Sequence, residues 1–407
     1  MAPSTRVPIS IFLRFALIFF CIQLPGSGFG ALPQSAVSPG RFENLAKKAE
    51  EAQAKDKLAE AAKLYKQALA LSRDWQDGWW ALGTLEYDQD HYAAAAQAFA
   101  KLIALNSANG TAHAMLGLCQ FELQEDVLAR QNLLQAEEFG VIKDDQLRKV
   151  ALYHLGILQL RARKFTAAKQ IFGQLASEGL NSKELINSLG LASLFLHPLE
   201  APPPGTEGAS IVERVGEAEV LMARKQFDQA KKIYAELMEQ SPDYPNLHFA
   251  FGRCLLDTHN TGEAVEEFQR ELHRDPKHVN SLLEMAAVNY LTNSEVGLKF
   301  AEQAANLAPK LPFAHYLLGL LRLDTGDARG AIPELRIANQ AFPSEPNIYF
   351  SLGKAYARAG RNADAAKARA EFMRLNAEAA EHPGTIAHDD HPAIPGVSPP
   401  ADATANP

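Results

Sequence analysis

The sequence predicts an all-α solenoid, a superhelix of about nine to ten helical hairpins arranged in two lobes. The first observation is a repeat: one small residue, mostly glycine after leucine, recurs along the chain. Six of the nine steps between its occurrences are 34 residues long. Second, no β-strand pattern is evident between these positions. A fixed period of this length indicates stacked helical pairs. The repeated positions are Ala49, Gly83, Gly117, Gly156, Gly190, Ala218, Gly252, Ala286, Gly319 and Gly353.

Each repeat contains two helical patterns separated by a short polar turn. The segment WWALGTLEYDQDHY at 79–92 is followed by Ala95 and Phe99, and LYHLGILQLRARKF at 152–165 by Ala168 and Phe172. Apolar residues at i, i+3, i+4 and i+7 give both helices a buried face. A glycine or alanine on the first helix should let the second approach closely, with the aromatic residue filling the groove beside it.

This pattern resembles the tetratricopeptide repeat, whose signature is Trp, Leu-Gly and Tyr on one helix, then Ala, Phe, Ala and Pro. The match runs from about residue 42 to residue 380. The resemblance implies a superhelix of stacked hairpins that binds other proteins or peptides. It is specific for the fold and names no partner.

Two repeats depart from the pattern. After Gly190 the chain continues into a segment with three consecutive prolines, Pro202–Pro204, which exclude a helix. No second helix is expected there, and the sequence predicts a first lobe over 42–197, a proline-rich junction at 198–210 and a second lobe over 211–381. In the repeat of Ala286, Gly297 and Ala301 replace the alanine and the aromatic residue, so looser packing is expected.

Both ends of the chain lie outside the repeats. Residues 1–30 resemble a secretory signal peptide: Arg6 and Arg14 precede a ten-residue apolar run, and a small-residue site precedes Ala31. A ten-residue run is too short to span a bilayer, which needs roughly 20 residues. No stable membrane span is expected after cleavage, with a retained anchor as the alternative. A linker is predicted at 31–41 and a disordered tail at 382–407, and the protein is expected to be exported, periplasmic or secreted.

The sequence offers no site for chemistry. A net charge of -8 and the lack of a long basic run disfavour nucleic acid as a partner. Neither a His-Glu-x-x-His nor a Gly-x-Ser-x-Gly motif occurs. The histidines and aspartates of the tail, between His382 and His391, could bind a metal, but a solvated tail is the simpler interpretation. Cys119 and Cys254 are expected to be small buried side chains. We therefore predict no catalytic residue, no cofactor and no metal.

The family resemblance implies that the first helices line a concave face. Large side chains occupy its inward positions, where a solvated surface would be polar. Trp80 is expected to face this groove together with Tyr87 and Phe121, whereas Trp79 is expected to be buried between helices. The lysine and asparagine of the family's carboxylate clamp are absent. The groove candidates are Trp80, Tyr87, Phe121, Tyr153, Phe249, Arg253, Tyr290, Tyr316 and Phe350, with Arg253 expected to pair with Asp257 and other neighbours.

These observations predict a non-catalytic scaffold or adaptor of the bacterial cell envelope that binds partner peptides or proteins in the aromatic groove. The alternative is an accessory subunit of an envelope machine, for polysaccharide export, pilus assembly or outer-membrane protein assembly. An enzyme is a third interpretation. The accessory-subunit interpretation would require stable docking to a membrane complex.

Overall fold

The computed structural model describes residues 39–140 and 144–381, and within these ranges every element is a helix. The chain divides into two compact units, Met1–Leu158 and Gln159–Pro407, with the division inside helix α8. The predicted signal peptide, most of the linker and the tail lie outside the described residues. The all-α solenoid is confirmed.

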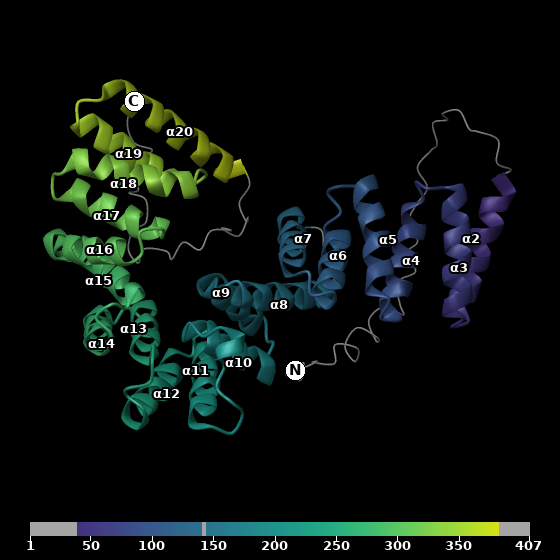
Figure 1. Ribbon diagram of the computed structural model, residues 1–407, viewed down its shortest axis with the longest axis horizontal. Helices are drawn as coiled ribbons and strands as arrows, with labels where there is room; N and C mark the ends of the chain where they lie inside the picture. The colour runs from purple at the N-terminus through teal and green to yellow at the C-terminus, as the bar shows by residue number, and fades with distance from the viewer. Residues whose placement is uncertain (1–38, 141–143, 382–407) are drawn as a thin grey trace. The chain divides into compact units, whose positions relative to one another are not determined.

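In the first unit, helices stand side by side in chain order from α2 to α7 (Figure 1). The pairs α2–α3, α4–α5 and α6–α7 are hairpins, and α3–α4 and α5–α6 contacts join one hairpin to the next. The helices are α2 (Pro39–Ala54), α3 (Leu58–Leu71), α4 (Gln76–Asp88), α5 (Tyr92–Leu105), α6 (Gly110–Glu122), α7 (Asp126–Phe139) and α8 (Asp145–Arg161).

The second unit continues the same plan, and a 3₁₀ turn, η2, lies in the proline-rich segment. From α13 onward, each odd-numbered helix is the first of a hairpin and the next even-numbered helix is the second. The elements are α9 (Phe165–Ser177), α10 (Lys183–Ser193), η2 (Pro198–Glu200), α11 (Glu207–Ala223), α12 (Phe227–Gln240), α13 (Leu247–Asp257), α14 (Thr261–Arg274), α15 (Val279–Thr292), α16 (Ser294–Leu307), α17 (Pro312–Asp324), α18 (Ala328–Ala341), α19 (Pro346–Arg358) and α20 (Asn362–Glu381).

Close contact at the repeat glycines holds the hairpins together. A Cβ added at Gly83 would lie 2.7 Å from the ring of Phe99, and one at Gly252 would lie 2.5 Å from the ring of Phe268. Both rings are completely buried. The steric role predicted for the small residues is therefore confirmed: a larger side chain would push the second helix away.

A left-handed residue ends the first helix of most hairpins, seven positions after the small residue. This conformation stops a helix and favours glycine, because other residues carry a Cβ that crowds the backbone. Only two of these turns use glycine. The residues are Asp56, Asp90, Gln124, Arg163, Lys225, His259, Gly326 and Gly360. The remaining turns therefore hold a left-handed backbone conformation that is strained for a residue with a Cβ.

The repeat of Gly190 lacks a second helix of its own, as predicted, and α11, the first helix of the next repeat, packs in its place. After η2 and the prolines, α11 begins at Glu207 and packs directly on α10. Two glycines make this approach reciprocal: a Cβ on Gly190 would lie 1.9 Å from the carbonyl oxygen of Val212, and one on Gly216 would lie 1.9 Å from that of Ile186. The proline-rich segment thus lies inside the second unit, and the lobe boundaries predicted around it stay a prediction.

The looser packing expected in the repeat of Ala286 is wrong. Ala286 and Ala301 are completely buried, and a Cβ on Gly297 would lie 2.9 Å from Leu321 Cδ2 and 3.1 Å from the Ala286 carbonyl oxygen. The small side chains let α15 and α16 come together, and Leu321 of α17 packs directly against Gly297.

Candidate functional site

The first helices of the second unit form an inner surface. Within the described residues, α15 contacts α17 and α17 contacts α19, whereas the second helices α14, α16, α18 and α20 make no comparably extensive contacts with one another. Helices that lie closer together are on the inside of a curved stack. We call the surface made by first helices, in each unit separately, the first-helix face.

In the first unit, three of the predicted groove residues are partly accessible on this face. Trp80 of α4 lies edge-on to Phe99, with ring centroids 5.5 Å apart. Phe121 of α6 meets His154 of α8 at 4.6 Å, and Tyr153 lies 5.8 Å from the same imidazole. Phe121, Tyr153 and His154 thus form an aromatic cluster across two successive first helices.

Tyr87 lies deeper than a groove residue should. Only 7% of its surface is exposed, and its ring packs edge-on against Tyr92 with centroids 5.3 Å apart. Burial raises the pKa of its hydroxyl far above the ordinary value, because the phenolate would be poorly solvated. Tyr87 is therefore a buried side chain that supports the first-helix face from within.

The two neighbouring tryptophans differ less in burial than the sequence predicts, since both Trp79 and Trp80 are half-buried. Trp79 packs beside the buried cluster of the first two hairpins, and its indole Nε1 donates a hydrogen bond of 2.8 Å to the Arg73 carbonyl oxygen. Trp80 makes its ring contact with the second-helix residue Phe99. The expected full burial of Trp79 is wrong, because its indole edge remains at the surface.

In the second unit, Phe249 and Tyr316 belong to the core. Phe249 is 5% exposed and lies 5.3 Å from the Phe195 ring and 5.8 Å from the Phe268 ring, and Tyr316 is 2% exposed. Burial raises the pKa of Tyr316 above its usual range. Neither side chain is open to a partner, because neighbouring helices cover these positions.

Tyr290 of α15 and Phe350 of α19 stay half-buried on the first-helix face. The ring of Phe350 lies 5.3 Å from that of Phe372 on α20, and the Lys354 ammonium lies 4.6 Å from the Phe350 centroid. This distance is typical of a cation–π contact. Aromatic surface and positive charge therefore meet on α19.

Arg253 does not ion-pair with the expected Asp257. It pairs instead with Glu284 of α15, a carboxylate with 9% of its side chain exposed. The charge of Glu284 raises the pKa of Arg253, and the pair bridges two successive first helices. Arg253 is thus a structural contact of the face, and little of its charge is available to a ligand.

Sequence reasoning missed a set of histidines that connect the two helices of a hairpin. His113 Nδ1 lies 2.8 Å from Asn132 Oδ1, His248 Nδ1 lies 2.6 Å from Glu267 Oε2, and His315 Nδ1 lies 2.7 Å from Glu334 Oε2. Each histidine stands four residues before the repeat glycine, and each partner follows 19 residues later. The shared repeat position was the signal that could have revealed them.

A polar network also lies inside the second unit. The carboxylate of Glu219, which is 4% exposed, accepts a 2.8 Å hydrogen bond from Tyr234 Oη and lies 2.9 Å from Lys169 Nζ. The three residues come from α9, α11 and α12. Since a buried charge needs such partners, this network fixes how these helices pack.

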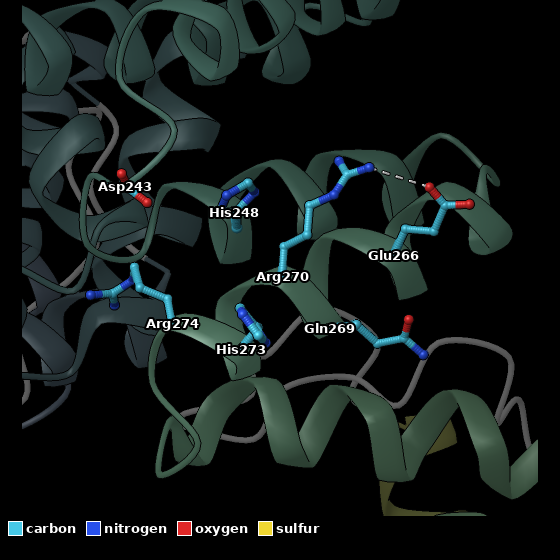
Figure 2. Close-up of a pocket in the computed structure, with 7 residues that line it drawn as sticks. All are labelled: Asp243, His248, Glu266, Gln269, Arg270, His273 and Arg274. Carbon is cyan, nitrogen blue, oxygen red and sulfur yellow. Dashed lines mark ion pairs between the residues drawn. The ribbon is translucent and has the colours of Figure 1, made fainter.

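An open hollow of about 560 Å³ lies beside α14, between this second helix and the connection from α12 to α13 (Figure 2). Arg270 points toward Glu266, with 3.5 Å between their charged groups, and the Arg274 Nε donates to the buried Glu271 at 2.9 Å. These carboxylates neutralise the arginines. The lining is polar and lacks the apolar floor typical of a cofactor site; its residues are Asp243, His248, Glu266, Gln269, Arg270, His273 and Arg274.

The described residues hold two buried cysteines and no cluster of metal-binding side chains. Cys119 and Cys254 are buried free thiols, as expected, and burial raises the pKa of each to about 12. Within residues 39–140 and 144–381, no three or more His, Cys, Asp or Glu side chains are placed to hold a metal ion. In the same ranges no helix has the length and apolar character needed to cross a membrane.

Comparison with known proteins agrees with this architecture. Tetratricopeptide repeat models match residues 80–140, 150–178, 221–286 and 316–379, together more than half of the chain. Superkiller protein 3 of Schizosaccharomyces pombe is 26% identical over 157 residues, which cover 35% of this chain and only 11% of that protein.

Solved structures that are similar to this chain include two of low sequence identity. MamA of Desulfovibrio magneticus RS-1 is 21% identical, with a TM-score of 0.38 over 40% of this chain and 94% of that one. The Cut9–Hcn1 hetero-tetramer of the APC/C contains a chain that is 13% identical, with a TM-score of 0.37 over 83% of this chain and 88% of that one.

The stacked hairpins and the first-helix face define a helical-repeat protein of the protein-interaction class. The chain belongs to the tetratricopeptide repeat family. Members of this family generally serve as non-catalytic scaffolds that bind other proteins or peptides.

Proposed function

We propose that this protein is a non-catalytic scaffold of the cell envelope that holds segments of partner proteins on its first-helix face. One observation carries the proposal: large aromatic side chains remain partly accessible on first helices of both units. They are Trp80, Phe121, Tyr153, Tyr290 and Phe350. Aromatic anchors of this kind supply much of the affinity in protein interfaces, because they bury a large area with few rotatable bonds.

The pattern of residues 1–30 supports the envelope location. A positive end, an apolar run of ten residues and a small-residue site before Ala31 are the elements of a secretory signal. Fractionation of cells that produce the full chain tests this part: protein in the envelope fraction with an N-terminus near Ala31 is expected, and an intact Met1 in the cytoplasm would refute it.

The binding part is tested with a double variant, Phe121→Ala with Tyr153→Ala. The matched control is Val127→Ala, because Val127 is an apolar side chain on the second helix α7 and is 62% exposed. Purified full-length proteins are used as bait in envelope extract, and bound proteins are quantified by mass spectrometry.

We expect a specific partner to be retained by the control and reduced by more than about tenfold with the double variant, the scale of losing one anchor. Circular dichroism checks that both variants fold. Equal binding by a folded double variant and the control would remove the first-helix face from the proposal.

A further inference from the structure

Helix α19 carries a row of three side chains on one face of the last hairpin. Phe350, Lys354 and Arg358 follow one another at four-residue spacing, so that they lie one above the next along the helix. Lys354 sits over the Phe350 ring at 4.6 Å, and the Arg358 Nη1 donates a hydrogen bond of 2.6 Å to the Leu323 carbonyl oxygen. We call these three residues the α19 row.

The two cations of the row lack a countercharge. Among the described residues, no carboxylate lies within 4.0 Å of the charged groups of Lys354 or Arg358, although Arg361 pairs with Asp364 and Arg374 pairs with Glu371 in the same hairpin. Two like charges four residues apart on a helix repel each other. An anion bound along the row would remove this repulsion.

The chain carries two adjacent acidic residues, Asp389 and Asp390, eight and nine residues after the end of α20. The segment 382–407 contains Asp389, Asp390 and Asp402 and neither lysine nor arginine. In contrast, α19 holds Lys354 and Arg358 and no acidic residue, in a chain whose net charge is -8. Charge complementarity therefore points to this segment as the occupant of the row.

The segment is long enough to reach the row. Phe372 of α20 lies against Phe350, and α20 ends at Glu381, nine residues later, or about 14 Å further along the helix. The eight residues from Glu381 to Asp389 can span up to about 28 Å. About 14 Å of this span brings the chain back to the level of Phe350. The remainder is enough to cover the distance of about 12 Å from Phe350 to Arg358 along α19.

We propose that Asp389 and Asp390 bind the α19 row of their own chain and occupy this end of the first-helix face until a partner segment displaces them. The bound segment would compete with a partner for the first-helix face. In this respect the proposal rests on the scaffold function proposed above. An attached segment needs little intrinsic affinity, because a short linker gives it an effective concentration of the order of millimolar.

The test is zero-length carbodiimide cross-linking of the full-length chain at low ionic strength, followed by peptide mapping. A carbodiimide joins an ammonium to a carboxylate in direct contact, as an amide with loss of water. Lys367 is the matched control, since it is an exposed lysine on α20 of the same hairpin that also lacks a described ion-pair partner. We expect Asp389 or Asp390 to link to Lys354 at least about tenfold more often than to Lys367, the ratio that a docked segment should give.

A variant and two changes of conditions then test whether the link reports the proposed contact. The link should disappear in the D389N/D390N variant, should weaken at about 1 M salt and should not depend on protein concentration. Equal linking to Lys354 and Lys367, absence of the Lys354 link, or a yield that rises with concentration would overturn the proposal. Cross-linking needs no partner, so the intramolecular contact can fail or succeed independently of the scaffold function. If both hold, D389N/D390N should also bind the partner several-fold more tightly.

Discussion

Replacing Gly190 by alanine is expected to destabilise the second unit strongly, because the new methyl group has no space. The added Cβ would lie 1.9 Å from the Val212 carbonyl oxygen and 2.8 Å from the carbonyl carbon. A relaxed carbon–oxygen contact is about 3.3 Å, so α10 and α11 would have to separate by about 1.4 Å. The obstacle is backbone, and no side-chain rotation can relieve it.

The loss in free energy of unfolding follows from the packing that this separation would disturb. Overpacking a core costs typically about 1–3 kcal/mol, and the upper end applies where backbone must move. Val212 and Val215 of α11 lie in a buried cluster, and a gap of about 1 Å loses up to roughly half of each dispersion contact. Alanine is better than glycine in a helix by about 1 kcal/mol, which offsets part of the loss. The expected net cost is about 2 kcal/mol or more.

Urea unfolding followed by circular dichroism measures this cost, and hydrogen exchange of α10 and α11 peptides localises it. Gly173→Ala is the control: Gly173 lies inside α9, and a Cβ there meets nothing within 4 Å. This variant should gain roughly 0.5–1 kcal/mol, since alanine loses less backbone entropy on folding. If Gly190→Ala proves as stable as Gly173→Ala, the reciprocal glycine contact is not as close as described.

Three other predictions test the turns, a buried carboxylate and export. Gln124→Gly should raise the free energy of unfolding by roughly 0.5–1 kcal/mol in urea titrations, because Gln124 has a φ of 61° that favours glycine; a loss would contradict the strain. Burial of Glu86 would raise its pKa, but Lys66 and His91 outweigh that effect and hold the pKa below its ordinary value. Because the folded pKa is depressed, this stabilisation is present above about pH 4.3 and fades as pH falls through the folded value, so Glu86→Gln should destabilise at neutral pH and much less near about pH 3. Equal costs at both pH values would show that charge is not the cause. Finally, Phe19→Arg should leave uncleaved precursor in the cytoplasm on immunoblots, because it interrupts the short apolar run; normal processing would argue against a signal peptide.

The hairpins could be predicted because their packing is local and repeats with the sequence. Gly83 and Phe99 meet within one repeat, so their spacing alone encodes the contact. The α10–α11 pair could not be predicted in the same way. Gly190 and Gly216 fit together across a segment whose prolines exclude a helix, and only the folded chain shows that α11 closes over α10.

The repeat positions that lie on the first-helix face could be predicted from the sequence. The exposure of the side chains at those positions could be predicted less well. Phe249, Tyr316 and Phe350 occupy the same repeat position, yet the first two are buried and the third is half-buried. The difference depends on how closely successive first helices approach, which is a property of the stack. Arg253 shows the same limit, because its partner Glu284 belongs to the next repeat.

Site-specific photo-cross-linking in living cells tests the central claim most directly. A photoreactive phenylalanine analogue is placed at Trp80, Tyr290 or Phe350 on the first-helix face, and at Gln131, Lys232 or Gln269 on the second helices α7, α12 and α14. We expect discrete adducts to the same partner protein from the first set and none of them from the second. Adducts that arise equally from both sets, or only from the second-helix positions, would contradict it.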